Sequence, residues 1–186
     1  MIDAGSDVSI VDASADHRDA GHPVCAVNAC KLVFVSSTAV AANAGSAVAY
    51  DTVCQNFADA RNLAGTWKAW MSDASGSPSS RFTHAGVPYR LLDGSVIANN
   101  WNDLTDGSLG HAINVMDDGS AAGSLQVWTG TTSSGTVAPT TCSGWTNATM
   151  SFIADFGMSD RTDDGWSDFQ LQYCNMPGMH VYCFEQ

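Results

Sequence analysis

The sequence predicts an α+β domain with few helices, several short strands and long loops. Three observations predict this class. Apolar residues recur at helical spacing within residues 46–62. Short apolar runs at residues 32–35, 66–71, 126–129 and 181–184 are typical of strands. Between these segments Gly, Ser, Thr, Asn and Asp dominate, which indicates long loops.

The first strand and the helix are predicted from their apolar patterns. The run at residues 32–35 is bounded by Ser36 and reads as a buried strand. In the helix, one apolar face is predicted to carry Tyr50, Val53, Cys54, Phe57 and Ala60. The opposite, polar face is predicted to carry Asp51, Gln55 and Asp59. Cys54 should therefore point at the core.

The middle of the chain is predicted from turn and capping signals. Residues 72–80 are rich in Ser, Gly and Pro and read as an exposed loop. The pair Asp93-Gly94 between residues 89–92 and 95–98 predicts a hairpin, because Asp-Gly readily adopts the positive φ that a tight turn needs. Asn100 is expected to cap a helical turn that begins at Trp101.

The domain organisation follows from composition. Residues 1–24 contain five Asp among Ala, Ser and Gly, with few large apolar groups, so we expect a disordered stalk. Residues 25–30 are expected to form a small loop closed by a Cys25–Cys30 disulfide. The folded domain is expected to span residues 31–186, and the 186-residue chain is long enough to bury a core.

The six cysteines indicate an oxidising compartment. No Cys-x-x-Cys pair occurs, which argues against zinc-ribbon and thioredoxin-like sites and favours disulfides. The last four cysteines allow three pairings, and the spacing alone does not choose among them. The chain has no apolar run of membrane-spanning length and no signal-peptide pattern at its start. We therefore expect an extracellular or cell-surface-tethered protein whose export signal is missing from this sequence.

The charge pattern limits the partners. Charged residues make up 14% of the chain, the net charge is −12, and the seven Lys and Arg are scattered. A nucleic-acid or heparin surface is not expected, because nothing supplies a basic stripe. The acidity suits solubility outside a cell or the binding of divalent cations.

Several motifs resemble a known family. Residues 49–54 and 60–72 resemble the helix–strand segment of the endostatin domain of vertebrate collagens, and residues 127–130 and 142–146 resemble its later strand and cysteine. Cys174 and the ending Tyr182-Cys183-Phe184-Glu185 match its last two cysteines. The pattern is closer still to a bacterial family of secreted domains of unknown function, found in myxobacteria and leptospires. It includes the segments at residues 94–101 and 104–107, and the resemblance covers roughly residues 31–186.

The resemblance implies a C-type-lectin-like (endostatin-like) fold with nested disulfides, Cys54–Cys183 and Cys142–Cys174. The longer of these would stabilise the domain by about 4–5 kcal/mol in the chain-entropy model. Endostatin's heparin binding does not carry over, because its clustered arginines are missing here. Its zinc site is not expected either, since His17 and His22 lie in the predicted stalk and the turn accounts for Asp93.

A calcium site is the first candidate site. Asp160, Asp163, Asp164 and Asp168 lie within nine residues that also contain Gly165. Calcium prefers several hard oxygen ligands, which such a loop supplies. The alternative is a solvated acidic loop whose Asp side chains cap turns. Calcium is the only cofactor that the sequence suggests.

A ligand face is expected on the loops around residues 105–125 and 155–170. Its candidate ligand-binding residues are Trp166, Asp117, Asp118 and His111. Trp166 lies among Asp and Gly residues and is the tryptophan expected to be exposed, whereas aromatic side chains usually serve packing. Asp117-Asp118-Gly119 has the alternative interpretation of a turn.

The predicted function is a non-enzymatic, secreted or cell-surface module that binds a glycan or a protein. The sequence has no nucleophile-elbow, zinc-protease or phosphate-loop motif, and its only Glu is Glu185. Two alternatives stay open: an extracellular hydrolase that uses Asp and His side chains in the loops, and a purely structural domain of an envelope protein.

Overall fold

The computed structural model describes Cys25 and residues 29–186 and has the α+β class that the sequence predicts. The predicted stalk at residues 1–24 lies outside the described residues. The elements, in chain order, are β1 (Lys31–Val35), α1 (Ala49–Ala60), β2 (Trp67–Ala69), α2 (Pro78–Arg81), β3 (Tyr89–Leu91), β4 (Val96–Ala98), α3 (Trp101–Leu104), β5 (Gln126–Trp128), α4 (Cys142–Trp145), β6 (Ile153–Met158), the 3₁₀-helix η1 (Asp164–Trp166), β7 (Gln170–Tyr173) and β8 (Tyr182–Glu185). No helix in this part of the chain has the length and apolar character to cross a membrane.

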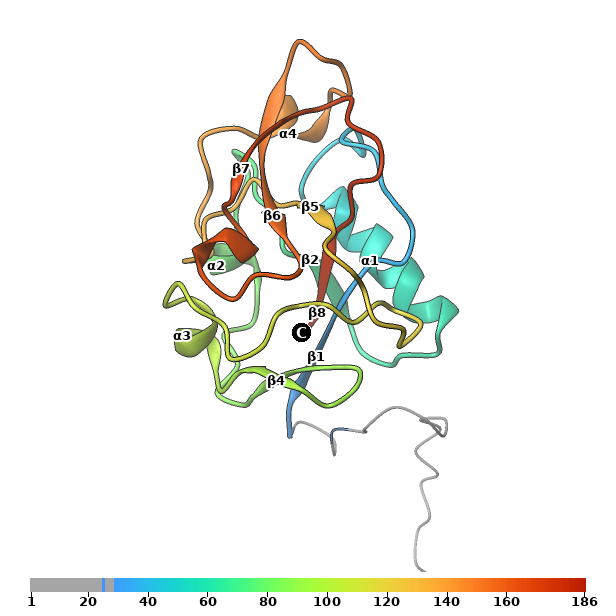
Figure 1. The fold of residues 1–186 in the computed structure, drawn as a ribbon, viewed down its shortest axis with the longest axis vertical. Helices are drawn as coiled ribbons and strands as arrows, with labels where there is room; N and C mark the ends of the chain where they lie inside the picture. Colours follow the sequence, from blue (N-terminus) through green and yellow to red (C-terminus); the bar gives the residue numbers. More distant parts are fainter. Residues whose placement is uncertain (1–24, 26–28) are drawn as a thin grey trace, which may run out of the picture.

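The larger sheet has five strands in the order β2-β8-β1-β3-β4. The C-terminal strand β8 lies between β2 and β1 and runs antiparallel to both, whereas β1 runs parallel to β3. The central strands β1 and β8 are almost wholly buried, as expected for apolar runs covered on both faces. The two ends of the domain therefore meet in its core (Figure 1).

The helix α1 is shorter than the predicted 46–62 and buries a slightly different face. Its buried residues are Tyr50, Cys54 and Ala58, whereas Ala60, which was placed on the apolar face, is exposed. Asp51 was placed on the polar face, yet its carboxylate accepts the N–H of Ala69 at 3.0 Å. The helix therefore packs along β2 on one flank as well as over the sheet.

Three disulfides join the described cysteines, and their pairing is the one expected. Cys54 on α1 bonds Cys183 on β8, and Cys142 on α4 bonds Cys174 just after β7. The third joins Cys25 to Cys30, although residues 26–28 of that small loop lie outside the described residues. The Cys54–Cys183 bond fixes α1 to the five-stranded sheet.

The smaller sheet has three strands in the order β5-β6-β7, all antiparallel, and only β5 is predicted from the sequence. β6 contains Asp155 and Gly157, which interrupt its apolar pattern. β7 is one of its two edge strands and pairs only with β6 (Figure 1). These two strands flank the acidic segment that contains η1.

The turn signals in the middle of the chain are confirmed, with one correction. β3 and β4 form the antiparallel hairpin, and Asn100 caps α3 by accepting the N–H of Asp103 at 3.1 Å. The segment predicted as an exposed loop at residues 72–80 is partly buried, at Ser72, Asp73 and Ser77, and it leads into α2. Its first turn is fixed by Pro78 and by the Ser77 N–H, which donates to Ser80 Oγ at 3.0 Å.

Candidate functional site

The acidic loop predicted to bind calcium does not gather its carboxylates. Asp163 is held by Arg161, whose Nε donates to Asp163 Oδ1 at 2.7 Å, and it also accepts the N–H of Gly165 at 3.2 Å. The hydrogen bond from Arg161 lowers the pKa of Asp163. Asp160 and Asp164 are exposed. Asp163 therefore serves as a cap of η1 rather than as a free ligand.

The fourth carboxylate of this loop faces another part of the molecule. Burial raises the pKa of Asp168, and the neighbouring carboxylate of Asp155 on β6 raises it further. Asp155 is itself buried and accepts both the N–H and the hydroxyl of Thr140, at 2.9 and 2.6 Å. Within the described residues, no group of three or more His, Cys, Asp or Glu side chains converges on a point where a metal ion would be held.

Trp166 was expected to be exposed, and this expectation is wrong. Its side chain is completely buried, 4.8 Å from the ring of Trp70 and 5.8 Å from that of Tyr182. The next residue, Ser167, is also buried and accepts the indole N–H of Trp70 at 2.7 Å. The segment is folded inward, so Trp166 belongs to the core and not to a ligand face.

The other predicted ligand residues make local contacts. Asp117 is 1% exposed and accepts the N–H of Ser37 at 2.5 Å and Arg61 Nε at 2.9 Å. Asp118 accepts the N–H of Ser120 at 3.0 Å, and its bonds with Ser120 lower its pKa. Asp117 thus ties two loops and a helix end together, whereas Asp118 forms the turn that was the alternative interpretation.

His111 is half-buried, and its Nδ1 lies 2.8 Å from the backbone oxygen of Ala112. The two loops predicted to form the ligand face do touch, because the N–H of Leu109 donates to the oxygen of Thr162 at 2.7 Å. Their carboxylates and His111 do not share a contact among the bonds of the described residues. The loops are adjacent, but they do not assemble the predicted site.

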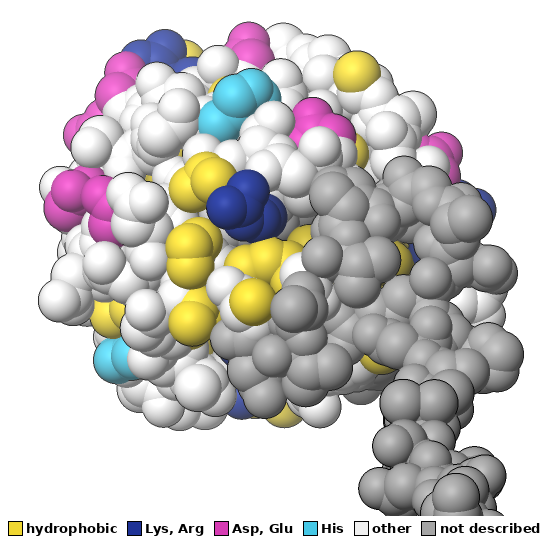
Figure 2. Space-filling view, turned by 90° about the horizontal axis from the view of Figure 1, so that it is seen from below, with side chains coloured by type: hydrophobic (Ala, Val, Ile, Leu, Met, Phe, Trp, Pro, Cys, Tyr) yellow, Lys and Arg dark blue, Asp and Glu magenta, His cyan; other side chains and the backbone are white. Residues whose placement is uncertain are grey.

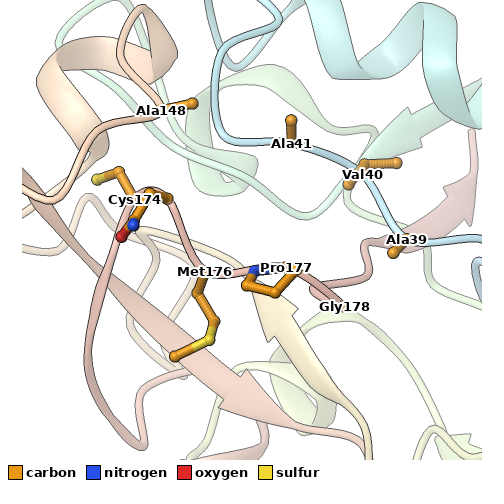
Figure 3. A pocket seen from close by; sticks show the side chains of 9 residues that line it. Ala39, Val40, Ala41, Ala148, Cys174, Met176, Pro177 and Gly178 are labelled. Carbon is orange, nitrogen blue, oxygen red and sulfur yellow. The ribbon is translucent and has the colours of Figure 1, made fainter.

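An apolar pocket of about 360 Å³ lies elsewhere, beside the Cys142–Cys174 disulfide. Figure 3 shows that three separate segments supply its walls: residues 39–41, Ala148 and residues 174–178. This volume falls in the range of ligand pockets, which are typically 300–1,000 Å³ and mostly apolar. The lining side chains are Ala39, Val40, Ala41, Ala148, Cys174, Asn175, Met176, Pro177 and Gly178.

The walls of this pocket are fixed by bonds that cross between segments. The N–H of Val40 donates to the oxygen of Met179 at 2.7 Å, which joins the first wall to the third. The hydroxyl of the buried Tyr50 donates to the oxygen of Ala41. The disulfide anchors Cys174 to α4. The pocket is therefore largely pre-formed, which lowers the entropic cost of binding.

The pocket is uncharged in a strongly acidic chain. All of its lining residues come from three stretches, residues 32–50, 119–154 and 169–179, that contain no Asp, Glu, Lys, Arg or His, although the net charge is −12. On the face in Figure 2 the acidic side chains form separate groups, and the basic ones are isolated. The sequence carried this signal, but only the fold shows that the three stretches meet.

A second pocket, of about 320 Å³, is lined by His84, Ala85, Gly86, Asn100, Trp101 and Asn102. The imidazole of His84 stacks on the indole of Trp101 with 4.1 Å between ring centroids and 4° between planes. Asn100 and Asn102 complete its wall, and His84 Nε2 lies 2.9 Å from the oxygen of Ser79. Sequence reasoning missed this pair, because the two residues are far apart in the chain.

Comparisons with known proteins add no further constraint on this site. No protein-family model matches the chain, and no curated protein matches it.

Proposed function

We propose that this chain is a non-enzymatic extracellular binding module of C-type-lectin-like fold, a member of the bacterial secreted family that it resembles, and that it binds a protein ligand at the apolar pocket. The observation that carries the proposal is the pre-formed, uncharged pocket beside Cys174.

The compartment is supported by the cysteines. All six form disulfides, and the described residues hold no free thiol. Such density of disulfides is typical of proteins that work outside the cytosol. The pairing of Cys54 with Cys183 and of Cys142 with Cys174 also has the nested order that the resemblance implies, which supports the fold assignment.

The ligand class is inferred from the pocket lining. Its side chains are those of Ala, Val, Met, Pro, Cys and one Asn, so it can bury an apolar group but offers few partners for hydroxyl groups. A glycan would leave many of its hydroxyls without hydrogen bonds there. An apolar side chain of a protein ligand gains from transfer out of water, by about 1.5–3 kcal/mol for a Val, Leu, Ile, Phe or Met.

Binding to a panel of purified extracellular proteins and to a glycan array, each with and without calcium, tests the proposal. We expect calcium-independent binding to a protein, with weak dependence on salt because the pocket has no charge. Ala41→Asp places a carboxylate in the exposed wall of the pocket and should weaken binding at least tenfold. Ala121→Asp is the matched control, since Ala121 is also exposed but lies outside the pocket.

Each of the other outcomes favours a different function. Calcium-dependent glycan binding that survives Ala41→Asp would point to a lectin, for which the stacked His84 and Trp101 supply the candidate pocket. Equal loss of binding in both variants would show that the ligand does not bind at the apolar pocket. Binding to no member of either panel would favour a structural domain of an envelope protein, and hydrolysis of a panel member would favour the hydrolase.

A further inference from the structure

We propose that two copies of this chain form a symmetric dimer by antiparallel pairing of their β7 edge strands, with Leu171 at the two-fold axis. The dimer goes beyond the proposed function, and it does not depend on the ligand of the apolar pocket. It rests on the backbone geometry of β7 and on the character of its side chains.

The backbone of Leu171 faces away from the rest of its sheet. Leu171 lies opposite Asp155 in the register of β6 and β7. The N–H of Asp155 donates to the oxygen of Thr140 at 3.1 Å, and its oxygen accepts the N–H of Gly130 at 3.0 Å, both away from β7. In antiparallel pairs, residues alternate between hydrogen-bonded and non-hydrogen-bonded positions. Leu171 is therefore in a non-hydrogen-bonded position, and its N–H and C=O point outward from the edge.

The neighbouring outward position is already satisfied. Tyr173 also lies in this register, but its N–H donates to Gln172 Oε1 at 2.9 Å and its oxygen accepts the N–H of Met176 at 3.0 Å. On β7, then, the described residues leave one outward donor and one outward acceptor without a partner, and both belong to Leu171.

The side chains of this edge are uncharged, and two of them are large, hydrophobic and exposed. Leu171 is 54% exposed, Tyr173 is 56% exposed, and Ile153 opposite Tyr173 is 37% exposed. Natural edge strands are usually protected from pairing by Lys, Pro or inward-pointing charges. β7 reads Gln-Leu-Gln-Tyr and has none of these. Of the large hydrophobic side chains exposed on the described surface, most lie on or beside the β6–β7 hairpin: Met150, Phe152, Ile153, Phe169, Leu171 and Tyr173.

A second copy fits this edge because the pairing is self-complementary. A hydrogen-bonded antiparallel pair needs one residue on each strand with both backbone groups pointing outward. When Leu171 pairs with Leu171 of the partner subunit, each donates to the other, and both free groups are satisfied at once. The same register sets Phe169 opposite Tyr173 of the partner subunit, on both sides of the axis. A C2 interface requires this kind of reciprocity.

The charge distribution is compatible with a second copy of the chain as the partner of β7. Each chain carries −12, so two copies repel each other at long range. The stretches 119–154 and 169–179 contain no charged residue. The charge that reaches this edge is that of Arg161, whose guanidinium lies 5.0 Å from the centroid of the Phe169 ring. The two copies of Phe169 lie on opposite sides of the axis, so the pairing does not set the two Arg161 side chains against each other. The dimer should therefore become tighter as salt screens the distant charges, whereas an interface held by ion pairs would weaken.

Sedimentation of the full chain over a range of concentrations tests the dimer. We expect the mass to rise with concentration from 19.5 kDa toward twice that value, and the dissociation constant to fall severalfold between about 0.05 and 0.5 M salt. Leu171→Lys sets two positive charges against each other across the axis and should raise the dissociation constant at least tenfold. Val137→Lys is the control, because Val137 is 47% exposed and lies in the loop between β5 and α4, outside β7.

A cross-linking variant gives an independent readout. Residues in a hydrogen-bonded antiparallel pair have Cα atoms about 5.5 Å apart, which lies within disulfide range. Leu171→Cys should therefore form a covalent dimer under mild oxidation, and Val137→Cys should not. A monomer at all concentrations and salts, equal effects of the two Lys variants, or equal cross-linking of the two Cys variants would each overturn the proposal. Circular dichroism confirms that each variant is folded.

Discussion

Gly157 on β6 lies directly beneath the backbone carbonyl of Trp166. A Cβ atom at residue 157 would stand 1.9 Å from the oxygen of Trp166 and 3.0 Å from the Cα of Ser167. No side chain fits in that space. Glycine at this position therefore allows the backbone of Trp166 and Ser167 to pack directly on β6, in the segment where the ring of Trp166 is buried in the core.

Gly157→Ala should therefore destabilise the domain, by about 2–4 kcal/mol, because the added methyl group meets backbone that cannot rotate away. Denaturant unfolding measures the loss. Gly123→Ala is the matched control: a Cβ there meets no atom within 4 Å, and the change should stay within about 0.5 kcal/mol. Equal stability of the two variants would show that Trp166 is not packed on Gly157.

The two large disulfides should differ in their contribution to stability. Their cysteines are equally buried, but Cys54–Cys183 spans 129 residues and Cys142–Cys174 spans 32. In the chain-entropy model these loops correspond to about 5 and about 3.7 kcal/mol. Paired Cys→Ala variants of each bond should show this order in denaturant unfolding. A greater loss from removal of the shorter bond would indicate that its anchoring of the apolar pocket matters more than loop entropy.

The sequence predicts those helices and strands in which the apolar side chains are the buried ones. β1, α1, β2 and β8 have strong apolar patterns and are found close to the expected positions. β6 is missed because a buried Asp155 and a Gly157 interrupt its pattern, and both are explained only by contacts with Thr140 and Trp166. β7 is also missed. Its Leu and Tyr alternate with Gln over only four residues, and these apolar side chains face solvent instead of the core.

The candidate sites show a different limit. The density of Asp around residues 160–168 is visible in the sequence, but whether carboxylates converge depends on side-chain pairing, and Arg161 takes Asp163. The sequence indicates the apolar pocket only in part, because its lining residues come from uncharged stretches of the chain. That these stretches meet depends on a contact between Val40 and Met179, which lie far apart in the chain, and no local sequence pattern contains that contact.

Tyr50 should make the domain sensitive to alkaline pH. Burial raises its pKa to about 12, whereas an unfolded tyrosine titrates near 10. Between these values the unfolded state has lost the proton and the folded state keeps it, so stability falls as pH rises, by about 2–3 kcal/mol in all. Tyr50→Phe has no hydroxyl to titrate, so this alkaline loss of stability is absent. At pH 7 the variant should be less stable than the wild type by about 1 kcal/mol, because it lacks the hydrogen bond to Ala41. Above pH 10 its free energy of unfolding should fall less steeply than that of the wild type.

Unfolding curves between pH 8 and 11.5 measure this difference. Tyr173→Phe, which removes the hydroxyl from a ring that is 56% exposed, is the comparison variant. If Tyr50→Phe and the wild type lost stability in parallel above pH 10, the alkaline sensitivity would have to come from other buried tyrosines, such as Tyr182.

Asp168→Asn should stabilise the protein at pH 7. The folded state raises the pKa of Asp168, through burial and then the charge of Asp155, so the folded state holds this proton more tightly than the unfolded state does. The stability that this proton supplies is complete below the unfolded pKa and is lost as pH rises through the folded pKa. An uncharged Asn avoids the loss. Because Asp168 is only half-buried and solvent still screens its charge, we expect a gain of about 0.5 kcal/mol at pH 7 that shrinks as the pH is lowered.

Asp118→Asn is the matched control with the opposite sign. Bonds from Ser120 lower the pKa of Asp118, so its ionised form supports the folded state, and that support is lost as pH falls through the folded pKa. Removing the charge should slightly destabilise the protein at pH 7, with the difference again shrinking in acid. Thermal melts of both variants at pH 7 and pH 3 check this pair. A loss of stability in Asp168→Asn at pH 7 would contradict the destabilising effect assigned to burial of the Asp168 charge beside Asp155.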